Sequence, residues 1–294
     1  MAQLTHEEKV ERFYSHGADP RAAQEDGLLS FGYWTESTAD YRQATEDLLA
    51  LVLEKEGPAH RGTVLNVACG NGTETFRLWE ALRPERIVAI DLTEAHIAFA
   101  SKAARRMGLA DKITFQKADA CTFSCPATRM SYVIGIEGPA HFNTRAAFLE
   151  KAYELLEPNG VLLLTDVIMK GDVASRSPFH RMLAGLASRQ WHMPKGNWMN
   201  LQDYRRLLSA IGFTVESMES IGHHVFPGFV RYNLRWSSLV AAMRTRGWRV
   251  GIGLTFISWL LGLVYRSGLS DYVYVRALKP GLGGASPAPE PPST

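Results

Sequence analysis

The chain between residues 63 and 166 alternates short apolar runs with segments in which apolar residues recur at helical spacing. Because the runs are apolar along nearly their whole length, they are typical of strands buried on both faces. The predicted strands cover residues 63–68, 86–91, 113–119, 132–137 and 161–166. Strands that alternate with helices, such as those predicted over 93–107 and 146–156, indicate an α/β fold with a doubly wound, mostly parallel sheet.

The flanks of this alternating core predict other kinds of structure. We expect a helical lid at 1–58, a ligand-binding core at 59–168, a substrate cap with C-terminal strands of the same domain at 169–280, and a disordered tail rich in Gly, Pro, Ser and Ala at 281–294. The lid contains two amphipathic patterns, over 6–17 and 38–54. The cap pattern predicts helices over 177–188 and 200–211, a strand over 213–220 and a last, edge strand over 272–278.

Composition and charge narrow the possible functions. The 294 residues are 46% hydrophobic and 21% charged, as in a soluble globular protein with a substantial core. The net charge is +2 and the Lys and Arg residues are spread along the chain, which does not favour a nucleic acid partner. Three cysteines give no disulfide framework, and Cys121 with Cys125 lacks the further ligands of a metal site, so no metal is expected. The polar N-terminus has no apolar signal segment, which predicts a cytoplasmic protein.

Polar or glycine-rich turns follow four successive predicted strands. The first strand ends in Gly70-Asn71-Gly72, which has neither the three-glycine dinucleotide pattern nor the Gly-Lys-Ser/Thr of a P-loop. Asp91 ends the second strand, about 20 residues after the glycine turn. At this spacing an acid can reach the ribose of a bound nucleotide. Asp119 ends the third strand, and Glu137 begins the turn that carries His141 after the fourth. The carboxyl ends of parallel strands are where such sheets bind ligands, so we expect one site there.

Residues 60–168 resemble the class I S-adenosylmethionine (SAM) dependent methyltransferases, which have a Rossmann-like fold. The resemblance rests on Val64-Leu65-Asn66-Val67-Ala68-Cys69-Gly70-Asn71-Gly72 and on the Leu155-Leu156-Glu157-Pro158-Asn159-Gly160-Val161-Leu162 segment. It is closest to the small-molecule and lipid branch, such as tocopherol-type and sterol-type methyltransferases. The resemblance implies a SAM site formed by Tyr33, Asn66, Ala68, Gly70, Gly72, Asp91, Leu92, Asp119 and Ala120.

Two of these positions need comment. Asn66 stands where the family usually has an acid, so this side chain can accept a hydrogen bond but adds no negative charge. Tyr33 matches the tyrosine of a Gly-Tyr-Trp element that contacts the cofactor in several small-molecule methyltransferases. Its aromatic segment, 31–34, forms either a lid over cofactor and substrate or a cap on the core.

Candidates for acid–base chemistry lie after the fourth strand. His141 is predicted to act as the base or to orient the substrate, since imidazole suits proton abstraction near neutral pH. Glu137 is the second candidate, either as a base or as a carboxylate that steadies a developing cation. His223 and His224 are further candidates for the pocket wall.

Residues 250–265 form an uncharged run of 16 residues flanked by Arg249 and Arg266. A spanning helix needs about 20 apolar residues, so the run is short for one. It predicts either a buried helix or oligomer contact, as in a homodimer, or a lipophilic substrate wall. Together with Trp248 it also fits a peripheral membrane contact through 248–265, which would make the protein membrane-associated.

The primary functional hypothesis is a SAM-dependent methyltransferase acting on carbon or oxygen of a lipophilic small molecule, such as an isoprenoid, a polyketide or a quinol. An alternative is a SAM-binding enzyme of the same fold that catalyses a non-methylating reaction such as cyclisation. A nucleic acid or protein methyltransferase, or a non-catalytic binding partner, is the third hypothesis. The absence of an Asn/Asp-Pro-Pro-Tyr/Phe element and of a basic tract disfavours it.

Overall fold

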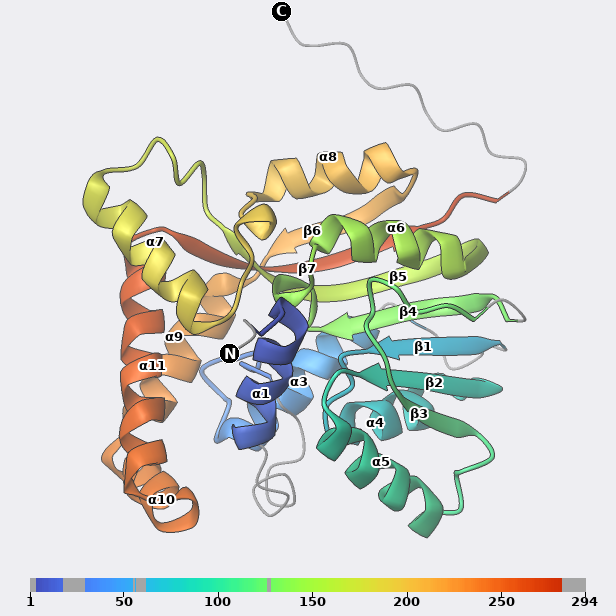
Figure 1. Ribbon diagram of the computed structural model, residues 1–294, viewed down its shortest axis with the longest axis horizontal. Helices are drawn as coiled ribbons and strands as arrows, with labels where there is room; N and C mark the ends of the chain where they lie inside the picture. Colours follow the sequence, from blue (N-terminus) through green and yellow to red (C-terminus); the bar gives the residue numbers. More distant parts are fainter. Residues whose placement is uncertain (1–3, 18–29, 55, 57–61, 126–127, 282–294) are drawn as a thin grey trace, which may run out of the picture.

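A computed structural model describes residues 4–17, 30–54, 56, 62–125 and 128–281 of the chain. It contains a seven-stranded sheet in the order β3-β2-β1-β4-β5-β7-β6, covered by helices on both faces (Figure 1). The strands are β1 (Thr63–Val67), β2 (Arg86–Asp91), β3 (Ile113–Lys117), β4 (Met130–Ile136), β5 (Leu156–Met169), β6 (Thr214–Ser220) and β7 (Ser270–Leu278). Strands β1 to β5 pair in parallel, which confirms the predicted α/β class.

Helices pack on the two faces of the sheet through separate apolar clusters. One face is covered by helices α3 (Tyr41–Leu53), α4 (Thr73–Leu82), α5 (Glu94–Arg106) and α9 (Gly222–Asn233), and the other by α6 (Arg145–Leu155) and α8 (Leu201–Ile211). Helix α8 begins after Asn200, whose side chain accepts a hydrogen bond from the Asp203 amide, and it ends at Gly212. These caps are the ones that the sequence pattern predicts.

The remaining helices lie beyond the carboxyl ends of the strands. Helix α1 (His6–Gly17) lies in front of these ends, and helices α7 (Pro178–Gln190), α10 (Trp236–Arg246) and α11 (Trp248–Arg266) form one side of the molecule (Figure 1). A third apolar cluster joins Leu183 and Ala187 of α7 to Leu260 and Val264 of α11. These elements therefore form a wall across the edge where the sheet is expected to bind ligands.

The sequence pattern predicted that the last strand lies at an edge of the sheet, and this prediction was wrong. Strand β7 lies between β5 and β6 and is antiparallel to both, so the outer strands of the described sheet are β3 and β6. Its alternation does not mark a solvent face, because Tyr272 and Tyr274 are buried on one side and Val273 on the other. Arg276 is partly buried and pairs with Glu56, with 2.6 Å between Nε and Oε1. The predicted disordered tail lies outside the described residues from 282 onwards.

The glycine turn after β1 is a sharp structural bend as well as a candidate ligand contact. Ala68, Gly70 and Gly72 all have positive φ angles, of 53°, 52° and 85°, and Gly72 is the N-cap residue directly before α4. A Cβ on Gly72 would lie 2.7 Å from Cβ of Ala100 and 2.9 Å from the Phe115 ring. Glycine at this position therefore lets α4 begin close against α5 and β3.

A comparison of two glycines tests this explanation. Gly72→Ala is expected to lower the free energy of unfolding by about 2–5 kcal/mol, because it adds overpacking to the cost of a left-handed backbone. Gly108→Ala is the matched control, since Gly108 also has a positive φ of 70° but no atom lies within 4 Å of its added Cβ. That variant should lose only about 1–2 kcal/mol. Equal losses in urea unfolding would contradict a packing role for Gly72.

Candidate functional site

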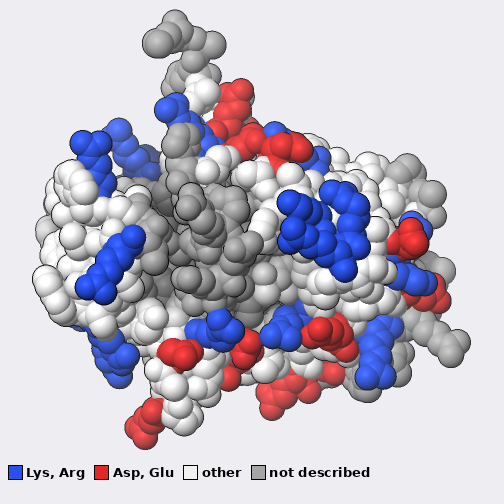
Figure 2. Space-filling model, turned by 90° about the horizontal axis from the view of Figure 1, so that it is seen from below, with Lys and Arg blue, Asp and Glu red and all other residues white. Residues whose placement is uncertain are grey.

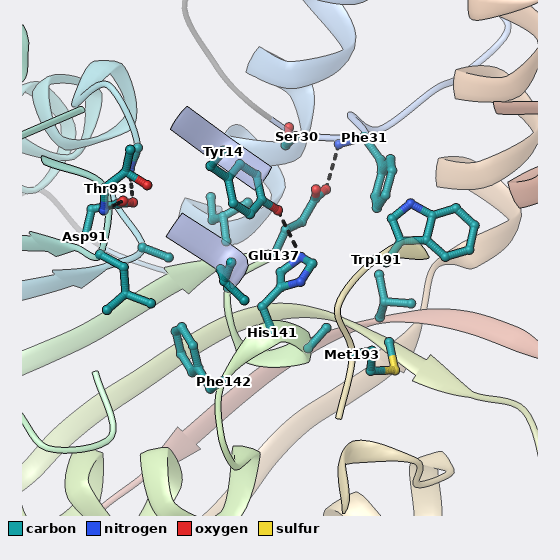
Figure 3. Close-up of a pocket in the computed structure, with 18 of the residues that line it drawn as sticks. Tyr14, Ser30, Phe31, Asp91, Thr93, Glu137, His141, Phe142, Trp191 and Met193 are labelled. Carbon is teal, nitrogen blue, oxygen red and sulfur yellow. Dashed lines mark hydrogen bonds between the residues drawn. The ribbon is translucent and has the colours of Figure 1, made fainter. Parts of the chain in front are cut away.

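A cavity of about 370 Å³ opens at the carboxyl ends of β1, β2 and β4. Its cofactor half, as we name it, is lined by Ala68, Gly70, Asp91, Leu92, Asp119 and Ala120. Its apolar half is lined by Met169 at the end of β5, by Trp191 and Met193 just after α7, and by Leu254, Ile257 and Leu261 of α11. Figure 3 shows Asp91 and Thr93 at one end, Trp191 and Met193 at the other, and Tyr14, Glu137 and His141 between them.

Asp91 is held as a carboxylate by the backbone around it. Its Oδ2 accepts a hydrogen bond from the Gly70 amide at 2.9 Å, and its Oδ1 accepts one from the Thr93 amide at 2.8 Å. Burial alone would raise the pKa of Asp91, but the interaction with His96 and these two amides lower it below its usual range. The side chain therefore joins the glycine turn to the end of β2 and presents a negative charge to the cavity.

Five more of the predicted cofactor contacts lie on the same wall. Ala68, Gly70, Leu92, Asp119 and Ala120 all border the cavity, at the strand ends where the sequence led us to expect a site. The Asp119 Oδ1 accepts a hydrogen bond from the Cys121 amide at 2.9 Å, which fixes the turn after β3.

Asn66 lies beneath the glycine turn and does not reach the cavity. Its Nδ2 donates to Oε1 of Glu74 at 2.7 Å, and its Oδ1 accepts a hydrogen bond from the Thr75 hydroxyl at 2.7 Å. Glu74 of α4 thus supplies an acid beside Asn66, where the family usually has one on the first strand. Burial raises the pKa of Glu74 to about 8. Neither Asn66 nor Gly72 lines the cavity: Asn66 ties β1 to α4, and Gly72 allows the close packing of α4.

Tyr33 also lies away from the cavity wall. Its amide donates to the Ala44 carbonyl at 2.7 Å, and its ring lies 4.5 Å from that of His224 on α9. His223 and His224 do not line the cavity either. Of the aromatic segment 31–34, it is Phe31 that borders the cavity, so this segment is partly a wall and partly a contact between α3 and α9.

His141 lies at the junction of the two halves with one ring nitrogen unpaired. Its Nε2 is 3.0 Å from the hydroxyl of Tyr14, while Nδ1 is buried without a hydrogen-bond partner among the described residues. Burial lowers the pKa of His141 to about 4 against an opposing interaction with the backbone of Trp191, so the ring is neutral at physiological pH. Tyr14 was not predicted, because a tyrosine on an amphipathic helix far from the strands gives no local indication of this contact.

Glu137 is the other polar group at the junction. It follows β4 with a φ of 62°, and its Oε1 accepts hydrogen bonds from the Phe31 amide at 2.6 Å and the Tyr272 hydroxyl at 2.8 Å. Burial raises the pKa of Glu137 to about 8. Both predicted catalytic residues therefore face one cavity, and Tyr272 is a further contributor that the sequence did not indicate.

A buried ion pair holds the turn that carries His141. Arg145 and Asp166 are both fully buried, with Nε 2.6 Å from Oδ2. Arg145 also donates to the carbonyls of Asn197 and Val167, at 2.6 and 2.9 Å. The Asn197 side chain in turn donates to the carbonyls of Ala140 and Phe142, at 3.0 and 2.8 Å, on either side of His141. The sequence analysis predicted no role for Arg145, Asp166 or Asn197, since their partners are distant in sequence.

The ionisable side chains that line the cavity are acids, histidines and tyrosines. The described residues that border it include Asp91, Asp119 and Glu137 with His96 and His141, but neither lysine nor arginine. Among the described residues there is also no group of three His, Cys, Asp or Glu side chains arranged to hold a metal ion. The site therefore suits a cationic or neutral ligand better than an anionic one.

Breaking the buried ion pair should be costly. Arg145→Met leaves the buried Asp166 carboxylate without its partner, and we expect a loss of about 3–5 kcal/mol in the free energy of unfolding. Arg77→Met is the control, because Arg77 pairs with Glu46 and Glu80 on the surface and should change stability by less than about 1 kcal/mol. The double variant Arg145→Met with Asp166→Leu should recover part of the loss. Similar effects of the two single arginine variants in urea unfolding would refute the importance of the buried pair.

Comparison with known proteins gives consistent results. Residues 64–160 match the family described as "Methyltransferase domain". The chain is 27% identical to erythromycin 3''-O-methyltransferase of Saccharopolyspora erythraea, over 90% of this chain and 87% of that protein. It shares its fold with geranyl diphosphate C-methyltransferase from Streptomyces coelicolor, solved with S-adenosyl-L-homocysteine, at 14% identity, a TM-score of 0.72 and coverage of 95% and 100%. The [4+2]-cyclase SpnF is equally similar in fold, at 20% identity, a TM-score of 0.72 and coverage of 96% and 99%.

Proposed function

This chain is a class I S-adenosylmethionine-dependent methyltransferase, and we propose that it methylates a hydroxyl group of a neutral, largely apolar small molecule. The observation that carries the proposal is the position of His141. Its unpaired, buried Nδ1 lies at the junction between the cofactor half and the apolar half of one cavity. An O-methyltransferase among the relatives of this chain supports the choice of oxygen.

The cofactor half fits the donor in charge and in shape. When bound, SAM supplies a methyl group already activated on a cationic sulfur, so the protein mainly has to bind and orient the reactants. Asp91 would accept hydrogen bonds from the ribose hydroxyls, and Asp119 with Ala120 would border the adenine. Ala68 and Gly70 bring the backbone of the turn up to the ligand. Glu137 would face the positively charged sulfur of SAM, and the described lining has no lysine or arginine to oppose that charge.

The apolar half indicates the kind of acceptor. Met169, Trp191, Met193, Leu254 and Ile257 provide apolar walls, which bind hydrocarbon by removing it from water. A diphosphate or phosphate acceptor would need positive partners that the described lining lacks. We therefore propose an uncharged acceptor such as a polyketide, an isoprenoid alcohol or a quinol, with its hydroxyl directed at the junction.

His141 can act as the general base for such a hydroxyl. In the tautomer whose Nε2–H donates to the Tyr14 oxygen, the neutral imidazole keeps its lone pair on Nδ1, which has no hydrogen-bond partner among the described residues. As the new carbon–oxygen bond forms, the hydroxyl proton becomes strongly acidic, so a base with a pKa of about 4 is sufficient to take it. Removal of that proton leaves a neutral ether.

The proposal is tested with SAM labelled in its methyl group and a panel of neutral apolar alcohols, phenols and quinols. We expect label in the product that partitions into organic solvent. His141→Gln should lower kcat by about 10²–10⁴-fold, which is the usual contribution of a general base. SAM affinity, measured by calorimetry, should change little in this variant, because His141 contacts the acceptor side.

Controls distinguish the alternatives. His223→Gln changes an exposed histidine that does not border the cavity and should leave kcat unchanged. Asp91→Asn should weaken SAM binding, because it removes the negative charge from the cofactor half. A transformed product without label would favour the non-methylating cyclase hypothesis. Label transferred only to phosphorylated or otherwise anionic acceptors would overturn the proposed acceptor class.

The pH dependence of cofactor binding tests the position of Glu137. Its pKa of about 8 means that the carboxyl gains a negative charge as the pH rises through this value. SAM affinity should therefore increase relative to that of S-adenosylhomocysteine, which lacks the methyl group and has an uncharged sulfur. Glu137→Gln should remove this pH dependence of the ratio of the two affinities. A ratio of the two affinities that stays constant from about pH 6 to 9.5 in the wild type would contradict this role.

A further inference from the structure

Helix α11 exposes a second apolar face, opposite to the one that lines the cavity. Leu254, Ile257 and Leu261 border the cavity. Trp248, Ile252, Phe256 and Trp259 follow one another at spacings of four and three residues, so they share the other face of the helix. Their exposed fractions are 60%, 53%, 51% and 47%, and the Phe256 and Trp259 rings stack with centroids 6.0 Å apart. We call these four residues the outer α11 face.

Helix α10, which packs against α11, carries further exposed apolar side chains. Trp236 is 76% exposed and Met243 36% exposed, and α10 crosses α11 closely where Met243 approaches Gly251. Contiguous exposed apolar surfaces of this kind commonly mark sites of interaction with a protein or a membrane. Since the inner face of α11 already belongs to the fold, the helix is not free to cross a membrane, although its length and hydropathy alone would allow it and only 33% of its apolar window is buried.

The charges around the outer α11 face have one sign. The sequence has no Asp or Glu from residue 221 to residue 270, whereas Arg235, Arg244, Arg249 and Arg266 are exposed at the ends of α10 and α11. Figure 2 shows the corresponding lobe, on the left, with Lys and Arg but without Asp or Glu on the visible face. Arg249 lies with its guanidinium 5.2 Å from the Trp248 ring, at the start of the apolar stripe.

We propose that the outer α11 face, with Trp236 and Met243 of α10, seats this protein on an anionic lipid bilayer surface. Tryptophans suit the boundary between headgroups and acyl chains, and arginines at its margin attract anionic lipid headgroups. A second copy of the chain is a poorer occupant. A symmetric pair would bring the same arginines together without an acid from residues 221–270 to neutralise them.

Seating on a bilayer would also place α11 between lipid and the apolar half of the cavity. One face of the helix would contact acyl chains while Leu254 and Ile257 contact the acceptor. The docking surface does not depend on the proposed methyl acceptor, since it is argued from exposure and charge alone. Its test therefore needs no turnover and can fail or succeed independently of the proposed function.

Co-sedimentation of the full chain with vesicles tests the proposal. We expect binding to vesicles of phosphatidylcholine with phosphatidylglycerol, weaker binding to phosphatidylcholine alone, and loss of binding at high salt. The double variant Phe256→Gln with Trp259→Gln should lower the partition coefficient by about tenfold or more, and Arg249→Gln by about fivefold.

Matched controls come from the opposite side of the molecule. Met107→Gln removes an apolar side chain that is 51% exposed after α5, and Arg106→Gln removes an exposed arginine beside it. Neither should alter vesicle binding, and circular dichroism with SAM calorimetry should show that all variants are folded. The proposal is overturned if anionic vesicles do not bind the wild type, or if the outer-face and control variants lose binding equally. It is also overturned if the outer-face variants instead dissociate a dimer while vesicle binding is absent.

Discussion

The buried ion pair between Arg145 and Asp166 is the interaction on which the candidate active site depends. It joins the start of α6 to β5, and through Asn197 it fixes the turn that carries His141. Since a lone charge at this depth would be strongly unfavourable, both partners must remain together in the folded state. The pair therefore fixes the His141 ring relative to the parallel sheet.

The fold and half of the site could be predicted from the sequence because they depend on local patterns. Apolar runs identify strands buried on both faces, and residues directly after them, such as Asp91, Asp119, Glu137 and His141, must reach one edge of the sheet. Asn66 lies outside the cavity lining for a physical reason. The family resemblance implied a contact with the cofactor, but the side chain is buried within β1, where its amide bonds to Glu74 and Thr75.

The rest of the site depends on contacts between distant segments. Tyr14 reaches His141 from α1, and Trp191 reaches the cavity from the end of α7, but nothing in either segment indicates its partner. The interior position of β7 is of the same kind. Its sequence fits an edge strand until β6 is placed beside it, and the Tyr272 hydroxyl then meets Glu137. Long-range pairing therefore determines which residues complete the site.

Burial shifts the pKa values of the two junction residues in opposite directions. It raises the pKa of Glu137 to about 8 and lowers that of His141 to about 4, so both groups are uncharged at neutral pH before ligands bind. In the proposed function, a cationic methyl donor would introduce the first charge at the junction, and it would favour ionisation of Glu137 while further disfavouring protonation of His141. The imidazole would stay available for the hydroxyl proton, and the carboxylate would balance the sulfonium. A cavity that is apolar on one side and acidic on the other thus uses a single physical effect, desolvation, to prepare both residues.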